Sequence, residues 1–82
     1  MNIDEFYKLG FKETMSSRYV ALTINEKHQI CKFKVEPYVT VYIGKPEIQD
    51  GVKYIGSTQI QMTKVNTIDK LKQLIKLLQN EN

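Results

Sequence analysis

The sequence is poor in the residues that build disulfides and metal centres. It contains one cysteine, Cys31, one histidine, His28, and no tryptophan. A disulfide framework needs paired cysteines, and a structural zinc site needs about four Cys or His ligands. The composition therefore excludes both kinds of scaffold, and we expect Cys31 to be a reduced thiol in a cytoplasmic environment.

Long apolar runs are also missing. No stretch approaches the roughly 20 apolar residues that cross a bilayer. The acidic first residues, Met1 to Glu5, lack the basic flank and apolar core of a signal peptide. We therefore expect a protein of the bacterial cytosol that does not associate with membranes. Of its twelve basic residues only Arg18 is an arginine, a bias typical of AT-rich genomes, which indicates a low-GC bacterium or one of its phages.

The remaining composition is that of an ordinary globular chain. Hydrophobic residues make up 41% of the sequence and charged residues 26%, with a formal net charge of +3. A length of 82 residues predicts a single domain that spans residues 1–82. A core of this size is modest, so dimerisation would be a natural supplement, and a homodimer remains an open alternative.

Hydrophobic periodicity predicts a helix at each end of the chain. The first helix starts after Asn2 and ends at Gly10. The last helix is capped by Asn66 or Thr67 and carries an apolar stripe made of Ile68, Leu71, Leu74, Ile75 and Leu78. Alternating residues between the helices predict four strands, at residues 18–24, 29–35, 38–44 and 52–65, with a loop at residues 45–51 and a bulge or bend at residues 56–57.

These elements follow the order α-β-β-β-β-α, which predicts an α+β fold. We expect a four-stranded, mainly antiparallel sheet with both helices packed on one face. In the second strand, Cys31, Phe33 and Val35 are expected to point into the core and Lys32 and Lys34 to point away from it. The expected core consists of Val20, Leu22, Phe33, Val39, Val41, Ile60, Leu71, Leu74 and Leu78.

The sheet face opposite the helices is the candidate binding face. We expect it to present Tyr19, Lys32, Lys34, Tyr38, Thr40, Tyr42, Gln59 and Gln61. Tyrosines that stack on bases and lysines that follow phosphates would make it a single-stranded nucleic-acid platform. Tyrosine is equally typical of protein interfaces, and a solvated face of Tyr, Thr and Lys is a third interpretation. The absence of arginine from this face counts against strong nucleic-acid recognition.

No catalytic constellation is evident. A nucleophile–base pair would have to join Cys31 with His28, but the strand pattern places the former in the core and the latter in a turn. The glycines match no phosphate-binding loop. The carboxylates are dispersed, as in Glu26, Glu36, Glu47, Asp50 and Asp69. We therefore expect a non-enzymatic protein with no cofactor and no metal.

The opening FYKLGFKE and the closing VNTIDKLKQLIKLLQ resemble segments of small phage and prophage products from low-GC bacteria. Some proteins of that kind bind and block host or defence proteins. The resemblance therefore implies a protein-binding module, such as a phage-encoded inhibitor, whose partner is a host protein or a second copy. The alternative is a single-stranded nucleic-acid-binding protein that uses the Tyr/Lys face.

Overall fold

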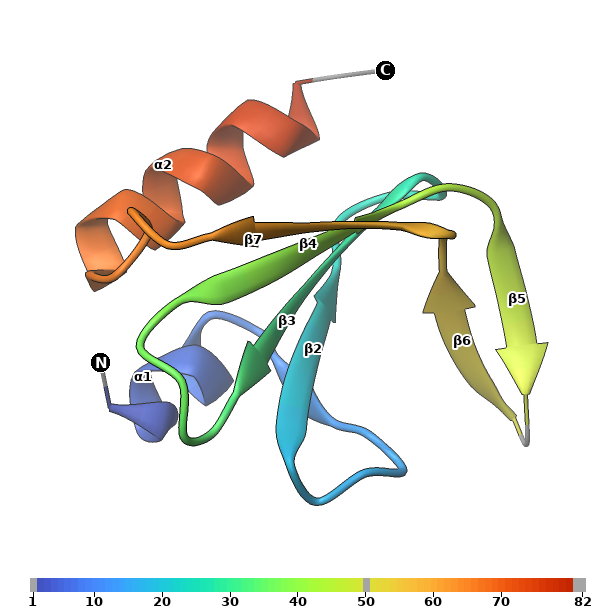
Figure 1. Cartoon of the computed structure of the whole chain (residues 1–82), viewed down its shortest axis with the longest axis horizontal. Helices are drawn as coiled ribbons and strands as arrows, with labels where there is room; N and C mark the ends of the chain where they lie inside the picture. The colour runs from blue at the N-terminus through green and yellow to red at the C-terminus, as the bar shows by residue number, and fades with distance from the viewer. Residues whose placement is uncertain (1, 50, 81–82) are drawn as a thin grey trace.

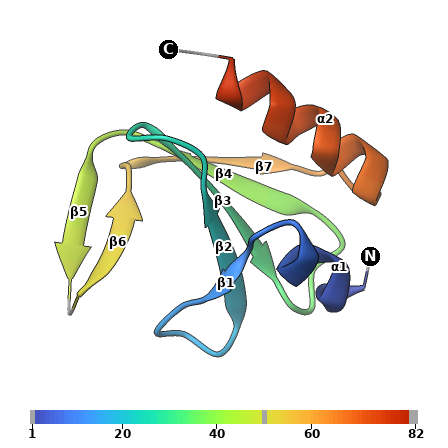
Figure 2. The same cartoon turned by 180° about the vertical axis from the view of Figure 1, so that it is seen from behind.

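The structure, a computed structural model, describes residues 2–49 and 51–80 and has an α+β architecture. Five strands form one antiparallel sheet in the order β1-β2-β3-β4-β7, and β5 and β6 form a separate two-stranded hairpin (Figures 1 and 2). The α+β class and the mainly antiparallel sheet are confirmed, whereas the predicted four-stranded topology is wrong. The elements are α1 (Ile3–Lys8), β1 (Lys12–Glu13), β2 (Tyr19–Thr23), β3 (His28–Phe33), β4 (Val39–Ile43), β5 (Pro46–Gln49), β6 (Val52–Ile55), β7 (Thr58–Met62) and α2 (Ile68–Gln79).

Both helices begin at side-chain caps. The Asn2 side chain accepts a hydrogen bond from the backbone N–H of Asp4 at 3.0 Å, and Thr67 accepts one from the backbone N–H of Lys70 at 3.3 Å. These contacts satisfy backbone donors that have no partner within the first helical turn. Gly10, with φ of 103°, follows the end of α1. Of the two predicted caps for the second helix, Thr67 is therefore the one used.

One face of the sheet carries the main hydrophobic core. Val20, Ile30, Val39 and Val41 are buried there against residues of both helices. The predicted helix packing differs from the structure, because the helices contribute unequally: α2 buries a stripe of three leucines, whereas α1 buries only Phe6. In both views α2 lies toward β7 and the short α1 lies by the end of β3 (Figures 1 and 2). The leucines of the stripe are Leu71, Leu74 and Leu78.

The segment from β4 to β7 is one long hairpin with a sharp bend. The two residue numbers of every pair add up to 101 both in the β4–β7 ladder and in the β5–β6 ladder, so neither side holds an extra residue. The predicted irregularity at residues 56–57 is therefore a bend and not a bulge. At the bend Gly44 and Gly56 approach so closely that a Cβ on Gly44 would lie 2.5 Å from the Cα of Gly56. Glycine is needed at both positions, because each also has a positive φ.

The distal half of this hairpin replaces the predicted loop at residues 45–51. Backbone N–H of Gly56 donates to the carbonyl of Lys45 at 3.1 Å, which makes that pair a hydrogen-bonded one. The next pair, Pro46 with Ile55, is then a non-hydrogen-bonded pair, so the missing N–H of the proline costs the ladder nothing. The Pro46 that indicated a loop is thus compatible with a strand. Asp50, part of the predicted turn, lies outside the described residues.

The side chains of β3 point the opposite way from the prediction. Register pairs Lys32 with Val20 and Ile30 with Leu22, so both β3 residues lie on the helix-covered face. Cys31 and Phe33 lie on the other face. The error is a one-residue slip, which turns every side chain of a strand over. The slip arose because side chains on both faces of β3 are largely buried, so the sequence pattern of this strand does not show which face packs against the helices.

Two further members of the predicted core are displaced. Phe33 is half-buried on the sheet face opposite the helices, called the second face below, where its ring packs against that of Tyr19. Ile60 does lie on the helix side of the sheet, but β7 is an edge strand and the side chain stays 43% exposed. Val35, expected inward, follows the end of β3 and is 90% exposed.

Candidate interaction surface

The second sheet face is partly covered by the β5–β6 hairpin. Cys31 and Thr40 are buried on this face, and Ile55 of β6 is buried as well, although Cys31 and Ile55 lie outside the main core. β6 contacts β3, and burial raises the pKa of Tyr19 on this face, with a smaller contribution from Tyr54 of β6. The bend at Gly44 and Gly56 therefore folds the hairpin back over a face that was expected to be open.

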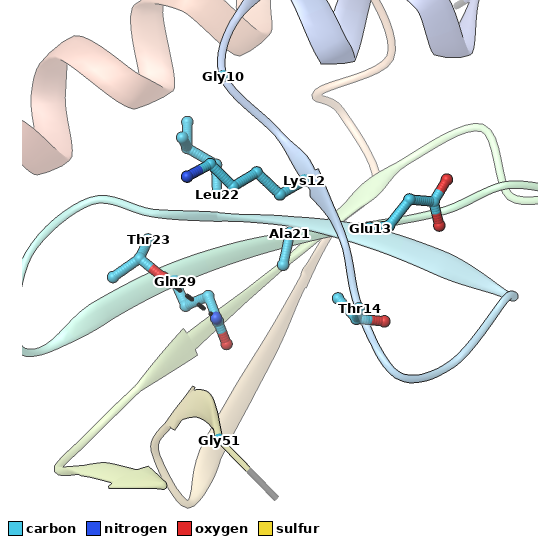
Figure 3. Close-up of a pocket in the computed structure, with 9 residues that line it drawn as sticks. All are labelled: Gly10, Lys12, Glu13, Thr14, Ala21, Leu22, Thr23, Gln29 and Gly51. Atoms are coloured by element: carbon cyan, nitrogen blue, oxygen red, sulfur yellow. Dashed lines mark hydrogen bonds between the residues drawn. The ribbon is translucent and has the colours of Figure 1, made fainter. Parts of the chain in front are cut away.

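A cleft of about 530 Å³ runs along β1 and the neighbouring part of β2, and Gly51 of the hairpin also lines it. Thr14, Ala21, Thr23 and Gln29 point to the side on which Gly51 lies (Figure 3). The Gln29 side chain is buried and its Nε2 donates to Oγ1 of Thr23 at 3.3 Å. The cleft lining thus comes from β1 and its flanking residues, from β2 and β3, and from Gly51.

The predicted binding-face residues fall into a buried group and an exposed group. Tyr19 packs on Phe33 with ring centroids 5.1 Å apart, and Tyr42 is half-buried; burial is the main cause that raises the pKa of both phenols. Thr40 is only 4% exposed, and Tyr38 is half-buried just before β4. Only Gln59 and Gln61, both on β7, are exposed members of the predicted face that lie within the sheet.

Lys32 does not belong to the candidate binding face. It is 3% exposed on the helix side, where its ammonium group lies 5.8 Å from the centroid of the Phe6 ring. The same Nζ donates to the backbone carbonyls of Phe33 and Glu36. Burial lowers the pKa of Lys32, and the nearby Glu36 carboxylate opposes that shift. Lys32 thus packs against the core residue Phe6 of α1 and is not available to a ligand.

Lys34 also lies away from the predicted face. Its Nζ is 3.3 Å from Oε1 of Glu13 in β1, and Glu13 accepts a further hydrogen bond from the hydroxyl of Tyr7 in α1. The bond from Tyr7 and then the contact with Lys34 lower the pKa of Glu13. This exposed network links α1, β1 and the segment after β3. The predicted Tyr/Lys surface is therefore not assembled.

Cys31 and His28 do not form a nucleophile–base pair. They are separated by three positions on β3, so their side chains leave opposite faces of the sheet. Nδ1 of His28 lies 3.0 Å from Oδ1 of Asn25, whose own Nδ2 donates to the carbonyl of Leu78 at the end of α2. His28 thus belongs to a network that ties the β2–β3 turn to α2. Burial raises the pKa of the Cys31 thiol to about 12.

Alkylation of Cys31 should therefore be slow in the native protein. At pH 8 a thiol with a pKa of about 12 holds on the order of a thousandfold less thiolate than an unperturbed cysteine. We expect iodoacetamide to modify the native chain at least that much more slowly than the urea-unfolded chain, as followed by mass spectrometry. Between pH 8 and pH 10 the native rate should keep rising while the unfolded rate levels off. Similar native and unfolded rates would contradict this burial.

The outer edge of β7 is a feature that the sequence reasoning missed. β7 is the last strand of the sheet order, so its outer side faces no other strand within residues 2–49 and 51–80. Gly56 forms a hydrogen-bonded pair with Lys45, and such pairs alternate with non-hydrogen-bonded pairs along an antiparallel ladder. Even-numbered residues of β7 therefore direct their backbone N–H and C=O groups toward β4. Gln59 and Gln61 therefore direct theirs outward. The signal was present, because residues 57–63 contain no charge and no proline.

The opposite edge of the sheet is β1, a strand of only two residues, both charged, and short charged edge strands discourage further pairing. β1 pairs with β2 through Lys12 and Glu13, and the hydroxyl of Thr14 donates to the carbonyl of Tyr19 at 3.2 Å. In the distal hairpin, β5 starts with Pro46 and carries Glu47, two residues that discourage further strand pairing. We refer to the outer edge of β7 together with the exposed side chains of Gln59, Ile60 and Gln61 as the β7 surface.

The described part of the chain contains no helix that is long and apolar enough to cross a membrane. Within the same residues, no three His, Cys, Asp or Glu side chains are grouped so that they could hold a metal ion. Comparison of the chain with family models, curated proteins and solved structures finds no match.

Proposed function

We propose that this chain is a small non-enzymatic protein-binding module that engages its partner polypeptide through the β7 surface. The observation that carries the proposal is the uncharged, exposed edge of β7, with the backbone groups of Gln59 and Gln61 directed outward. Such an edge accepts an extended segment as an additional strand, in which main-chain hydrogen bonds provide affinity and alternate side chains provide specificity. An inhibitor encoded by a phage against a host or defence protein is the biological role that the resemblance of the chain termini favours.

The placement of the lysines supports a protein partner over a nucleic acid. The nucleic-acid interpretation required Lys32 and Lys34 beside the tyrosines, but Lys32 is buried under α1 and Lys34 contacts Glu13. The tyrosines are themselves partly withdrawn, since Tyr19 packs on Phe33. With Lys32 and Lys34 withdrawn from the face, less positive charge remains beside the tyrosines to neutralise phosphates.

Proline at position 61 tests the proposal. Gln61→Pro removes an N–H that points away from β4, so the β4–β7 ladder keeps its hydrogen bonds and the fold should survive. We expect immobilised wild-type chain to retain at least one protein from a low-GC bacterial lysate, identified by mass spectrometry, and the Gln61→Pro variant to lose it.

Gln61→Ala is the matched control, because it shortens the same side chain and keeps the backbone donor. It should retain the captured protein with at most a few-fold loss, since the main-chain bonds are unchanged. Circular dichroism should show that both variants are folded. The proposal fails if all three chains capture the same proteins, or if the wild type captures none.

A further inference from the structure

From the geometry of this edge, we infer that a second copy of the chain pairs with it: two β7 strands associate in antiparallel orientation about a two-fold axis at Ile60, and their sheets become continuous. This inference rests on the proposed function, because it names the partner of the β7 surface. It commits to one register, and that register follows from the direction of the backbone groups along β7.

Only Gln59 and Gln61 offer outward backbone groups within β7. A two-fold axis at Ile60 places Gln59 of each copy opposite Gln61 of the other, so both residues form hydrogen-bonded pairs that exchange two bonds each. An axis at either glutamine would place that residue opposite itself and pair the other one with a residue beyond the strand ends. The register centred on Ile60 therefore uses the whole edge.

The side chains are complementary in the same register. Ile60, which is 43% exposed in the single chain, meets Ile60 of the second copy in a non-hydrogen-bonded pair, the closer of the two antiparallel pair types. On the opposite face Gln59 and Gln61 side chains lie directly across from each other and can exchange amide hydrogen bonds. Apolar side chains thus meet on the helix side and amides meet on the other.

Charge favours a second copy at this place. The chain carries a net charge of +3, so association of two copies through a lysine-bearing surface would bring like charges together. Residues 57–63 carry no charge, which makes the β7 edge a place where two identical chains meet without that penalty. Five strand residues per copy form a small interface, so the dimer should dissociate on dilution.

Sedimentation equilibrium of the purified chain tests the association. We expect the apparent mass to rise from 9.6 kDa toward twice that value with concentration, for the wild type and for Gln61→Ala. Gln61→Pro should stay at the monomer mass at every concentration, because each copy lacks a donor that the pairing uses. A wild type that remains monomeric throughout, or a Gln61→Pro variant that dimerises like the wild type, would overturn the inference.

Disulfide trapping tests the register. Across the proposed axis the two Ile60 Cα atoms are about 4.5 Å apart, within the range that a disulfide spans. Ile60→Cys should therefore form a covalent dimer with oxidised glutathione. Thr58→Cys is the matched control: it is also exposed, but its counterpart in the second copy is four residues away from the position it faces, roughly 13 Å along the strand. Equal cross-linking of both variants would show that the register is wrong.

The native Cys31 should not interfere, since it is only 3% exposed in the native fold, which both variants should keep. The two experiments also separate this inference from the proposed function. A monomeric chain that still captures a lysate protein in a Gln61-dependent manner removes the second copy and leaves the protein-binding role intact. A chain that dimerises in the Ile60 register and captures nothing else keeps the dimer and removes the role in binding other proteins.

Discussion

Replacing Gly56 with alanine should lower the free energy of unfolding by about 3–5 kcal/mol, because a close contact and an unfavourable backbone conformation add together. A Cβ at this position would lie 2.3 Å from the carbonyl oxygen of Ile43, and the residue has φ of 89°. The clash is with backbone, which cannot rotate out of the way. For a chain of this size the total stability is roughly 4–12 kcal/mol, so the substitution should remove at least a quarter of it.

Gly51→Ala provides the control for Gly56→Ala. Gly51 also has a positive φ, 78°, but nothing lies within 4 Å of the position of its added Cβ. Gly51→Ala should therefore lower the free energy of unfolding only through the unfavourable backbone conformation, by about 1–2 kcal/mol. Urea unfolding followed by circular dichroism measures both variants. If the two substitutions cost the same, the bend is not a point of close backbone approach.

Phe6→Ala should cost about 3–5 kcal/mol, a typical loss for a fully buried aromatic side chain. Phe6 is 0% exposed and is the only buried residue of the described α1. Its ring packs edge-on against the ring of Phe11, with the two centroids 5.1 Å apart. A six-residue helix does not persist alone, so loss of this ring should also release α1. Urea unfolding measures the first effect and amide hydrogen exchange in α1 measures the second.

Two comparisons assign the effect of Phe6→Ala to its ring. Tyr7→Phe keeps the ring of the neighbouring residue and removes only its exposed hydroxyl with the hydrogen bond to Glu13, so it should cost at most about 1 kcal/mol, well below the cost of Phe6→Ala. The effect of Phe6→Ala should also shrink by about 0.5–1 kcal/mol when Lys32 is replaced by methionine, because the ammonium over the ring is then absent. Additive effects of Phe6→Ala and Lys32→Met would show that this contact contributes nothing.

The sequence predicts elements well where one side is clearly apolar. The stripe of α2 and the alternation of β2 and β4 each have one inner side, and the structure places Leu74, Val20 and Val41 in the core as expected. Caps are local too, so Asn2 could be identified from its position and the second cap could be narrowed to Asn66 or Thr67, of which the structure uses Thr67.

The prediction fails where cover comes from a distant segment. β3 is buried on both faces, so the lysine in its pattern was taken for a solvent-facing residue, although Phe6, 26 positions earlier, covers Lys32. The second face was expected to be open because nothing local shows that residues 46–55 fold back over it. Both errors carried over into the predicted binding face, and of its residues only Gln59 and Gln61 are exposed within the sheet.

The uninterrupted pairing of the bent hairpin limits how its length can change. Gly44 and Gly56 meet at the bend because β5 and β6, which lead from the bend to the tip of the hairpin and back, pair one to one with no extra residue on either strand. Removal of one residue from β5 alone would bring a residue with a side chain into that contact. Removal of one residue from β5 and one from β6 would leave the contact as it is. Insertions and deletions that this segment tolerates should therefore come in even numbers, split between its two strands.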